Sequence, residues 1–178
     1  MLNLGQGRRV LYLDFDGVLH HENVYRHPTR GPVLHAPAEF RLFQHAELLA
    51  NLLEPYPDIA IVLSTSWVRV LDFHRSRKRL IEPLRERVIG ATFHRRHMRD
   101  QWKFMDLPRG IQVLADVQRR QPAAWLALDD DGEGWPDLFR GHLILTDPVH
   151  GISAPKVLTE IRRKLELLNE HVVARPAD

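Results

Sequence analysis

Residues 10–19 constrain the fold more than any other stretch of the chain. They read Val-Leu-Tyr-Leu-Asp-Phe-Asp-Gly-Val-Leu, a short apolar run that ends in two carboxylates one residue apart. In a β-strand alternate side chains share a face, so Asp14 and Asp16 project together while Phe15 turns towards the core. Gly17 follows at once, which suits a chain that leaves the strand sharply with no Cβ in the way. The pattern predicts a buried strand with an acidic pair at its carboxyl end.

Two carboxylates this close repel each other unless one is protonated or a cation lies between them. Their place at the end of a strand therefore indicates a site for Mg²⁺ and phosphate. A calcium-binding EF-hand loop is the weaker interpretation, because it needs an oxygen-bearing side chain two residues after Asp16, where this chain has Val18.

Short apolar runs alternate with amphipathic segments along the rest of the chain. We expect strands at 10–13, 59–63, 125–128 and 143–145. We expect helices at 38–54, 73–87 (interrupted near Pro83), 110–120 and 154–172. The segments 17–37 and 94–108 read as irregular. This alternation predicts an α/β fold with three layers, α/β/α, around a mostly parallel, Rossmann-like sheet. A length of 178 residues fits one domain spanning 1–178.

Polar residues follow two more of the predicted strands. Ser64, Thr65 and Ser66 come after the second strand, and Asp129 and Asp130 come after the third. Ligand sites in open α/β sheets form at the carboxyl ends of the strands, so these groups are expected to meet the acidic pair. Hydroxyl groups and free backbone N–H groups suit phosphate oxygens, and carboxylates suit Mg²⁺.

These segments, in this order and spacing, resemble the haloacid dehalogenase (HAD) superfamily of phosphatases and phosphotransferases over nearly the whole chain. The first motif is matched by Asp14-Phe15-Asp16-Gly17-Val18-Leu19. Thr65, after a buried strand, fits the second motif, with Ser64 as the alternative register. Within the superfamily the chain is most similar to small bacterial HAD domains, some fused to RNA-repair modules. The residues that carry this closer similarity are Thr65-Ser66-Trp67, Leu128-Asp129-Asp130 and Thr146-Asp147-Pro148.

The resemblance implies a Mg²⁺-dependent phosphatase with a minimal cap or none. It implies that Asp14 attacks phosphorus to give an aspartyl-phosphate, and that Asp16 acts as general acid and then as general base. It implies that Asp14, Asp129 and the backbone carbonyl of Asp16 hold the metal. Asp130 has two interpretations, a carboxylate next to the metal or a helix cap. Thr65 would donate a hydrogen bond to a phosphoryl oxygen.

The third motif of the family is a Lys or Arg that holds the nucleophile and the phosphate. Arg109 is favoured, because it stands just ahead of the predicted helix before the third strand, and Lys103 is the alternative. Trp67 is expected to pack beneath the phosphate loop, with stacking on a substrate base as the alternative. His20 and His21 are expected at the surface or in turns, although His20 could line the mouth of the site.

Charge is distributed unevenly along the chain. Residues 69–120 hold 14 Lys or Arg against 6 Asp or Glu, whereas the whole chain has a net charge of only +2. A basic middle suits an anionic partner such as a nucleic-acid end, and a solvated helix face is the alternative interpretation. Segment 69–108 could form a minimal cap, which would leave the site open to a bulky phosphorylated substrate. A phosphotransferase, or a non-catalytic binding module, remains an alternative, although the presence of both Asp14 and Asp16 disfavours the second.

Composition excludes several other kinds of site. The chain has no cysteine, which rules out disulfides, thiolate metal ligands and thiol nucleophiles. Arginines precede the first apolar run and every apolar run is too short to span a bilayer, so we expect no signal peptide, no membrane association and a cytoplasmic location. The oligomeric state is left open.

Overall fold

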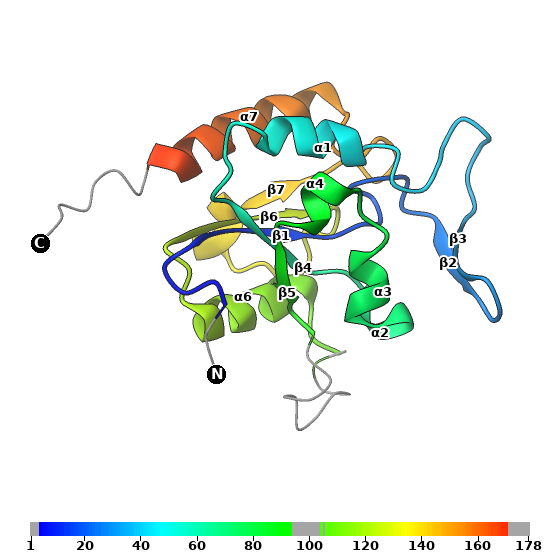
Figure 1. Cartoon of the computed structure of the whole chain (residues 1–178), viewed down its shortest axis with the longest axis horizontal. Coiled ribbons are helices and arrows are strands. Elements are labelled where there is room, and N and C mark those ends of the chain that lie inside the picture. The colour runs from blue at the N-terminus through cyan, green and yellow to red at the C-terminus, as the bar shows by residue number, and fades with distance from the viewer. Residues whose placement is uncertain (1–3, 94–103, 105, 171–178) are drawn as a thin grey trace, which may run out of the picture.

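A five-stranded parallel sheet forms the centre of the fold (Figure 1). The computed structural model of the chain describes residues 4–93, 104 and 106–170. The strand order is β5-β4-β1-β6-β7, so the chain starts in the middle and adds strands first on one side and then on the other. Ligand sites in open α/β sheets form at such a reversal of strand order, which here lies at the end of β1. The strands are β1 (Arg9–Leu13), β4 (Ala60–Leu63), β5 (Val88–Ala91), β6 (Ala124–Asp129) and β7 (Leu143–Leu145).

Helices cover both faces of this sheet (Figure 1). On one face lie α1 (Ala46–Leu53) and α7 (Pro155–Glu170), and on the other lies α6 (Arg109–Arg120). The prediction of a three-layer α/β/α fold is therefore confirmed. Three short helices lead from β4 to β5, and a 3₁₀-helix precedes β7. They are α2 (Trp67–Leu71), α3 (Phe73–Arg77), α4 (Glu82–Arg85) and η1 (Asp137–His142).

Strand β1 shows how the alternation of side chains builds two cores. Leu11 and Leu13 enter the core beneath α1 and α7, whereas Val10 and Tyr12 enter the core beneath α6. All four side chains are buried. A strand covered on both faces reads as a continuous apolar run, which is why the sequence predicted this strand so readily.

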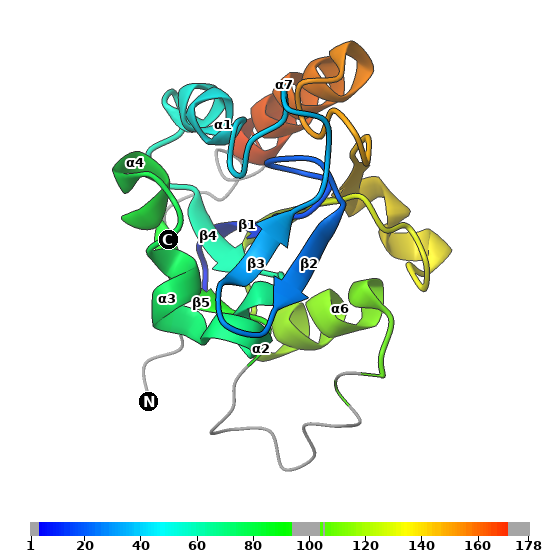
Figure 2. The same ribbon diagram turned by 90° about the vertical axis from the view of Figure 1, so that its right-hand side faces the viewer.

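A β-hairpin, β2 (Val24–His27) with β3 (Gly31–Leu34), follows β1 and is antiparallel. The prediction that 17–37 is irregular was therefore wrong. Figure 2 shows the hairpin in front of the ends of the sheet strands, and β3 contacts α2. One face of the hairpin is open, since Tyr25 is 61% exposed and its cross-strand partner Val33 is 38% exposed. Pro32 is the only buried residue of its two strands, so there was no strong apolar alternation to reveal the hairpin.

Two other elements differ from the predictions. The first helix begins at Ala46 instead of residue 38, because the chain before it turns and Phe43 adopts a positive φ of 59° that no helix allows. Strand β5 was not predicted. The predicted interruption of helix 73–87 near Pro83 is confirmed, since this segment forms two short helices, α3 and α4, and the break precedes Pro83.

Segment 69–108 contains α3, α4 and β5, and β5 pairs with β4 in the central sheet. Residues 94–103 and 105 lie outside the described residues, so a minimal cap in this segment stays a prediction. No helix in the described part of the chain is long and apolar enough to cross a membrane.

Candidate active site

The ends of the three central strands are joined by backbone hydrogen bonds. The N–H of Asp14 donates to the carbonyl of Leu128 at 3.1 Å, and the N–H of Ser64 donates to the carbonyl of Leu13 at 2.8 Å. The residues that follow β1, β4 and β6 therefore leave the sheet side by side. This brings Asp14, Thr65 and Asp129, which are far apart in the sequence, to one edge of the sheet.

Three carboxylates meet at this edge. Asp14, Asp129 and Asp130 each place a carboxylate oxygen within 4.8 Å of the others. Asp14 is 5% exposed and Asp129 is 1% exposed. Burial raises the pKa of Asp14, and its repulsion from Asp16 adds to this, although Arg109 opposes it. Burial and repulsion from Asp14 raise the pKa of Asp129 well above its usual value. Burial and the same repulsion raise the pKa of Asp130 to about 7.

These carboxylates fit a divalent cation. Oδ2 of Asp129 is buried and accepts no hydrogen bond from any described residue, and its charged partner among them is Nε of Arg109, 3.4 Å away. Oδ1 accepts a hydrogen bond from the N–H of Asp131 at 3.1 Å. Three clustered carboxylates around one arginine leave negative charge that a divalent cation would balance. Oxygen ligands and surplus negative charge are what Mg²⁺ requires. Asp130 belongs to this cluster and caps no helix of the described residues. This favours its interpretation as a carboxylate next to the metal over its interpretation as a helix cap.

Gly17 makes room for Asp130. Its φ is +64°, and a Cβ at this position would lie 2.1 Å from Oδ2 of Asp130. The glycine therefore allows both the sharp exit from β1 and the approach of a carboxylate from the loop after β6. The sequence predicted the first of these reasons only.

Arg109, the first residue of α6, points into the acidic cluster. Its Nη2 lies 3.3 Å from Oδ2 of Asp14, and its Nε lies 3.4 Å from Oδ2 of Asp129. Burial opposes the charge of the guanidinium, but Asp14 and Asp129 outweigh it and raise the pKa of Arg109. Arg109 thus lies where the third motif needs a cation. The alternative residue, Lys103, lies outside the described residues.

Hydroxyl groups from the end of β4 complete this part of the site. The Thr65 side chain is buried and forms a hydrogen bond with Asp14 that lowers the pKa of that carboxyl. Oγ of Ser64 is also buried, and no described residue is its partner. Ser66 occupies the N-cap position of α2 without a side-chain capping bond. The three predicted phosphate-binding residues therefore lie together, with Thr65 in direct contact with Asp14.

Asp16 is not one of the three clustered carboxylates and has hydrogen-bond partners of its own. Its Oδ1 accepts hydrogen bonds from Nε1 of Trp67 at 2.9 Å and from Nε2 of His20 at 3.0 Å. His20 is fully buried and His21 is 8% exposed, so neither lies at the surface, although both directly follow the turn 17–19. Trp67 is buried at the start of α2, as predicted, but its bond to Asp16 was missed. Only the spacing of four residues from Asp16 to His20 hinted at a contact.

The loop after β7 braces the loop after β1. Oγ1 of Thr146 donates to the carbonyl of Gly17 at 2.6 Å, and the N–H of Ile152 donates to the carbonyl of Val18 at 3.0 Å. Gly151 lets the two loops touch, because a Cβ there would lie 2.2 Å from the carbonyl oxygen of Val18.

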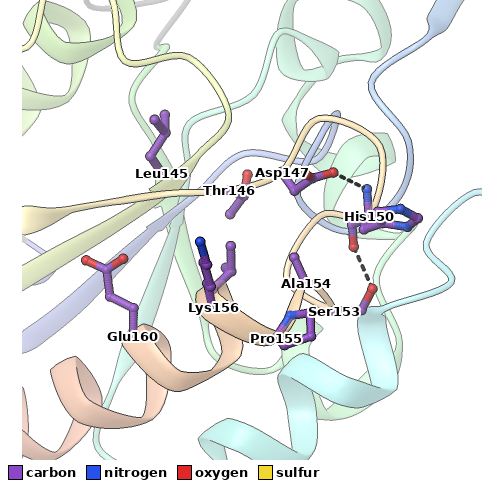
Figure 3. A pocket seen from close by; sticks show the side chains of 10 residues that line it. Leu145, Thr146, Asp147, His150, Ser153, Ala154, Pro155, Lys156 and Glu160 are labelled. Atoms are coloured by element: carbon purple, nitrogen blue, oxygen red, sulfur yellow. Dashed lines mark hydrogen bonds between the residues drawn. The ribbon is translucent and has the colours of Figure 1, made fainter.

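The bracing loop also lines a hollow of about 780 Å³, whose lining residues Figure 3 shows. Within the loop, His150 donates its N–H to Asp147 and accepts a bond from Oγ of Ser153 through its carbonyl. The hollow is lined by the loop and the start of α7 and contains none of the three carboxylates, so it lies beside the candidate site.

Comparison with known families agrees with this geometry. A family model described as the HAD domain in Swiss Army Knife RNA repair proteins matches residues 10–157. The match includes Asp14, Thr65, Arg109 and Asp129, together with the bracing Thr146. Comparisons with curated proteins and with solved structures found no match. The chain belongs to the family of HAD domains in Swiss Army Knife RNA repair proteins, a family of the phosphatase-like hydrolase type.

Proposed function

We propose that the protein is a Mg²⁺-dependent phosphatase that acts through an aspartyl-phosphate on Asp14. One observation carries the proposal. Asp14 lies in a buried cluster of carboxylates and contacts both Arg109, at 3.3 Å, and Thr65, so that a nucleophile, a cation and a hydroxyl donor share one strand end. The family match supports a hydrolase of this general kind.

The reaction has two displacements at phosphorus. A carboxylate oxygen of Asp14 forms a bond to phosphorus as the bond to the leaving oxygen breaks, and Asp16 gives its proton to that oxygen. A water oxygen then attacks phosphorus and loses a proton to Asp16, while the bond from phosphorus to Asp14 breaks and phosphate is released. Arg109 and Thr65 hold the nonbridging oxygens, whose charge develops during both steps.

Mg²⁺ would be held by Asp14, Asp129 and the backbone carbonyl of Asp16, with Asp130 beside them. When bound, the ion neutralises the repulsion between the carboxylates and an anionic substrate.

The direct test is release of phosphate from an aryl phosphate in the presence of Mg²⁺. Asp14→Asn should reduce the rate by roughly three powers of ten or more, because an amide forms no acyl-phosphate. The control is Asp137→Asn, since that carboxylate is 99% exposed and pairs only with Arg140 among the described residues. Equal activity of Asp14→Asn and Asp137→Asn, or activity that persists in excess chelator, would overturn the proposal.

We further propose that the substrate phosphate is carried on a nucleotide or on the end of a nucleic acid. A hollow of about 460 Å³ between α3 and α4 is lined by four basic side chains, His74, Arg77, Lys78 and Arg85. Within the described residues no carboxylate forms an ion pair with Arg77, Lys78 or Arg85. The hollow lies in the basic segment 69–120, and a surplus of positive charge in a concave surface suits a phosphodiester backbone.

A length series of oligonucleotides with terminal phosphates tests the substrate class. Native protein should prefer an oligonucleotide over a mononucleotide, and added salt should weaken that preference. The double variant Lys78→Gln/Arg85→Gln should raise KM for the oligonucleotide by roughly tenfold and leave the mononucleotide unchanged. The control Arg75→Gln/Arg79→Gln removes the same charge from exposed side chains outside the hollow. An equal effect of the two double variants would indicate only a general charge effect.

A further inference from the structure

The environment of Asp16 is asymmetric between its two oxygens. Oδ1 accepts two hydrogen bonds, from the Trp67 indole at 2.9 Å and from the His20 imidazole at 3.0 Å. No described residue donates to Oδ2. An oxygen that already accepts two donors is a poor place for a proton, so protonation of the carboxyl is directed to Oδ2.

A third hydrogen bond determines which nitrogen of His20 carries the proton. The backbone N–H of Phe43 donates to Nδ1 of His20 at 3.3 Å. Nδ1 must therefore offer a lone pair, which places the ring hydrogen on Nε2, where it faces Asp16. His20 is thus a neutral donor to Asp16 with a fixed tautomer.

Phe43 reaches His20 in an unusual backbone conformation. Its φ of 59° lies in the left-handed region, which a phenylalanine rarely adopts. Such strain persists where the surrounding structure requires it, often at functional sites. The Phe43 ring also packs edge-on against Trp67 at 5.2 Å and lies 5.0 Å from the His20 ring. The backbone N–H of Phe43 therefore orients the His20 ring, and the Phe43 side chain is an apolar neighbour of both donor rings.

We infer that His20 and Trp67 are positioning residues that hold Asp16 by one oxygen and leave the other to exchange protons with the reacting groups. This inference rests on the proposed phosphatase chemistry. When the bond from phosphorus to the leaving oxygen breaks, the proton on Oδ2 of Asp16 passes to that oxygen. In the second step Oδ2 recovers a proton from the attacking water. Trp67 and His20 keep their own protons throughout.

The sensitivity of the rate to the leaving group separates this role from a structural one. The leaving group of para-nitrophenyl phosphate departs with little help from an acid, whereas that of benzyl phosphate requires a proton. We expect the double variant His20→Leu/Trp67→Phe to reduce kcat on benzyl phosphate by roughly a hundredfold and on para-nitrophenyl phosphate by less than about fivefold. His20→Gln, which keeps an N–H donor at the same reach, should recover most of the loss caused by His20→Leu.

The control variant is Phe43→Leu. It disturbs the same aromatic cluster but leaves both donors and the backbone N–H of residue 43 in place, so it should affect the two substrates equally. Equal losses on the two substrates in His20→Leu/Trp67→Phe would overturn the inference.

A second measurement separates failure of this inference from failure of the proposed function. The Trp67 indole N–H signal in a ¹⁵N-labelled protein, assigned by its loss in Trp67→Phe, should move upfield in Asp16→Ala, because its acceptor has been removed. If native protein hydrolyses neither substrate, the proposed function fails and the role in catalysis fails with it. If native protein is active but the indole signal does not move in Asp16→Ala, the positioning role alone is overturned.

Discussion

The two ends of α6 each bring arginine and carboxylate side chains together, but in opposite proportions. At the start of the helix, Arg109 faces three carboxylates, Asp14, Asp129 and Asp130. At the end of the helix, within the described residues, two arginines, Arg119 and Arg120, face one carboxylate, Asp116.

The cluster at the end of α6 satisfies its carboxylate. Asp116 accepts hydrogen bonds from Nε of Arg120 at 2.6 Å, from the hydroxyl of Tyr12 at 3.1 Å and from Arg119. Arg120 also donates to the carbonyl of Ala91 at 3.5 Å and to that of Leu4. Burial, together with Asp116, raises the pKa of Tyr12, so its hydroxyl remains a donor. The cluster ties α6 to β1, β5 and the amino-terminal segment.

The difference between the clusters separates a structural role from a chemical one. Buried ion pairs stabilise a fold only when each polar atom has a partner, as the partners of Asp116 illustrate. The cluster at Arg109 has surplus negative charge, and a buried oxygen of Asp129 accepts no hydrogen bond from the described residues and has only its ion pair with Arg109 there. Local violation of the rule that buried polar groups are paired is expected where a ligand completes the site.

Replacing Arg109 or Arg120 by glutamine should give the largest effects on activity and on stability, respectively, and tests the comparison directly. Arg109→Gln should lower kcat/KM for phosphate release by roughly a hundredfold or more, because the transition-state charge loses a fixed cation. Arg120→Gln should instead lower the free energy of unfolding by about 3–5 kcal/mol, because a buried carboxylate loses a partner. Denaturant unfolding and steady-state kinetics on both variants check the prediction.

The exposed Arg140 supplies the control, since Arg140→Gln should change neither quantity. The comparison breaks if Arg120→Gln reduces the activity of the folded protein as much as Arg109→Gln does.

The next largest effect is expected in the pH dependence of the stability of the metal-free protein. A carboxyl whose pKa is higher in the folded protein than in the unfolded chain binds its proton more tightly when folded, so deprotonation weakens folding. The pKa of Asp130 is raised to about 7, so its contribution falls as the pH rises from about 4 towards 7. In excess chelator the melting temperature should decrease over this range, and saturating Mg²⁺ should restore it at the upper end.

Asp130→Asn should flatten that slope, whereas Arg120→Gln should lower the melting temperature at each pH and keep the slope. A melting temperature that is unchanged by Mg²⁺ above neutral pH would contradict the assignment of the metal to this end of α6.

Two glycines allow a finer comparison with the smallest expected effects. A Cβ on Gly17 would lie 2.1 Å from Oδ2 of Asp130, and a Cβ on Gly90 would lie 2.5 Å from Nη2 of Arg120. Gly17→Ala should weaken Mg²⁺ binding by roughly tenfold, because it displaces a carboxylate beside the metal. Gly90→Ala should lower stability but leave metal affinity unchanged. Isothermal titration with Mg²⁺ distinguishes the two, and similar affinities in both variants would contradict the prediction.

The sequence predicted the parts of the fold that depend on local pattern. The apolar run before Asp14 and the one before Asp129 identified two central strands. Because sites in open α/β sheets form at the carboxyl ends of the strands, the two carboxylates were expected to lie together. Strand β5 was missed because it has only four residues, one of them Gly90, and directly follows a helical segment. The hairpin was missed because Pro32, Arg26 and His27 obscure any strand pattern in it.

The contacts around Asp16 could not be predicted from the sequence, for a different reason. Trp67 lies 51 residues from Asp16, and their hydrogen bond exists only because β1 and β4 are neighbours in the sheet. The surroundings of His20 depend likewise on the turn at Phe43, whose helical spacing in the sequence suggested a helix. Side-chain partners set by topology become visible only once the strand order is known.

The bracing of one loop by another has a consequence for how this scaffold can diversify. Because Thr146 and Ile152 hold the segment just after Asp16, the acidic cluster is anchored independently of the hairpin that follows it. Insertions or exchanges at the hairpin tip, residues 28–30, are therefore expected to change the surface in front of the strand ends without displacing Asp14. On this scaffold the surface that a ligand meets first and the carboxylates behind it can change independently in evolution.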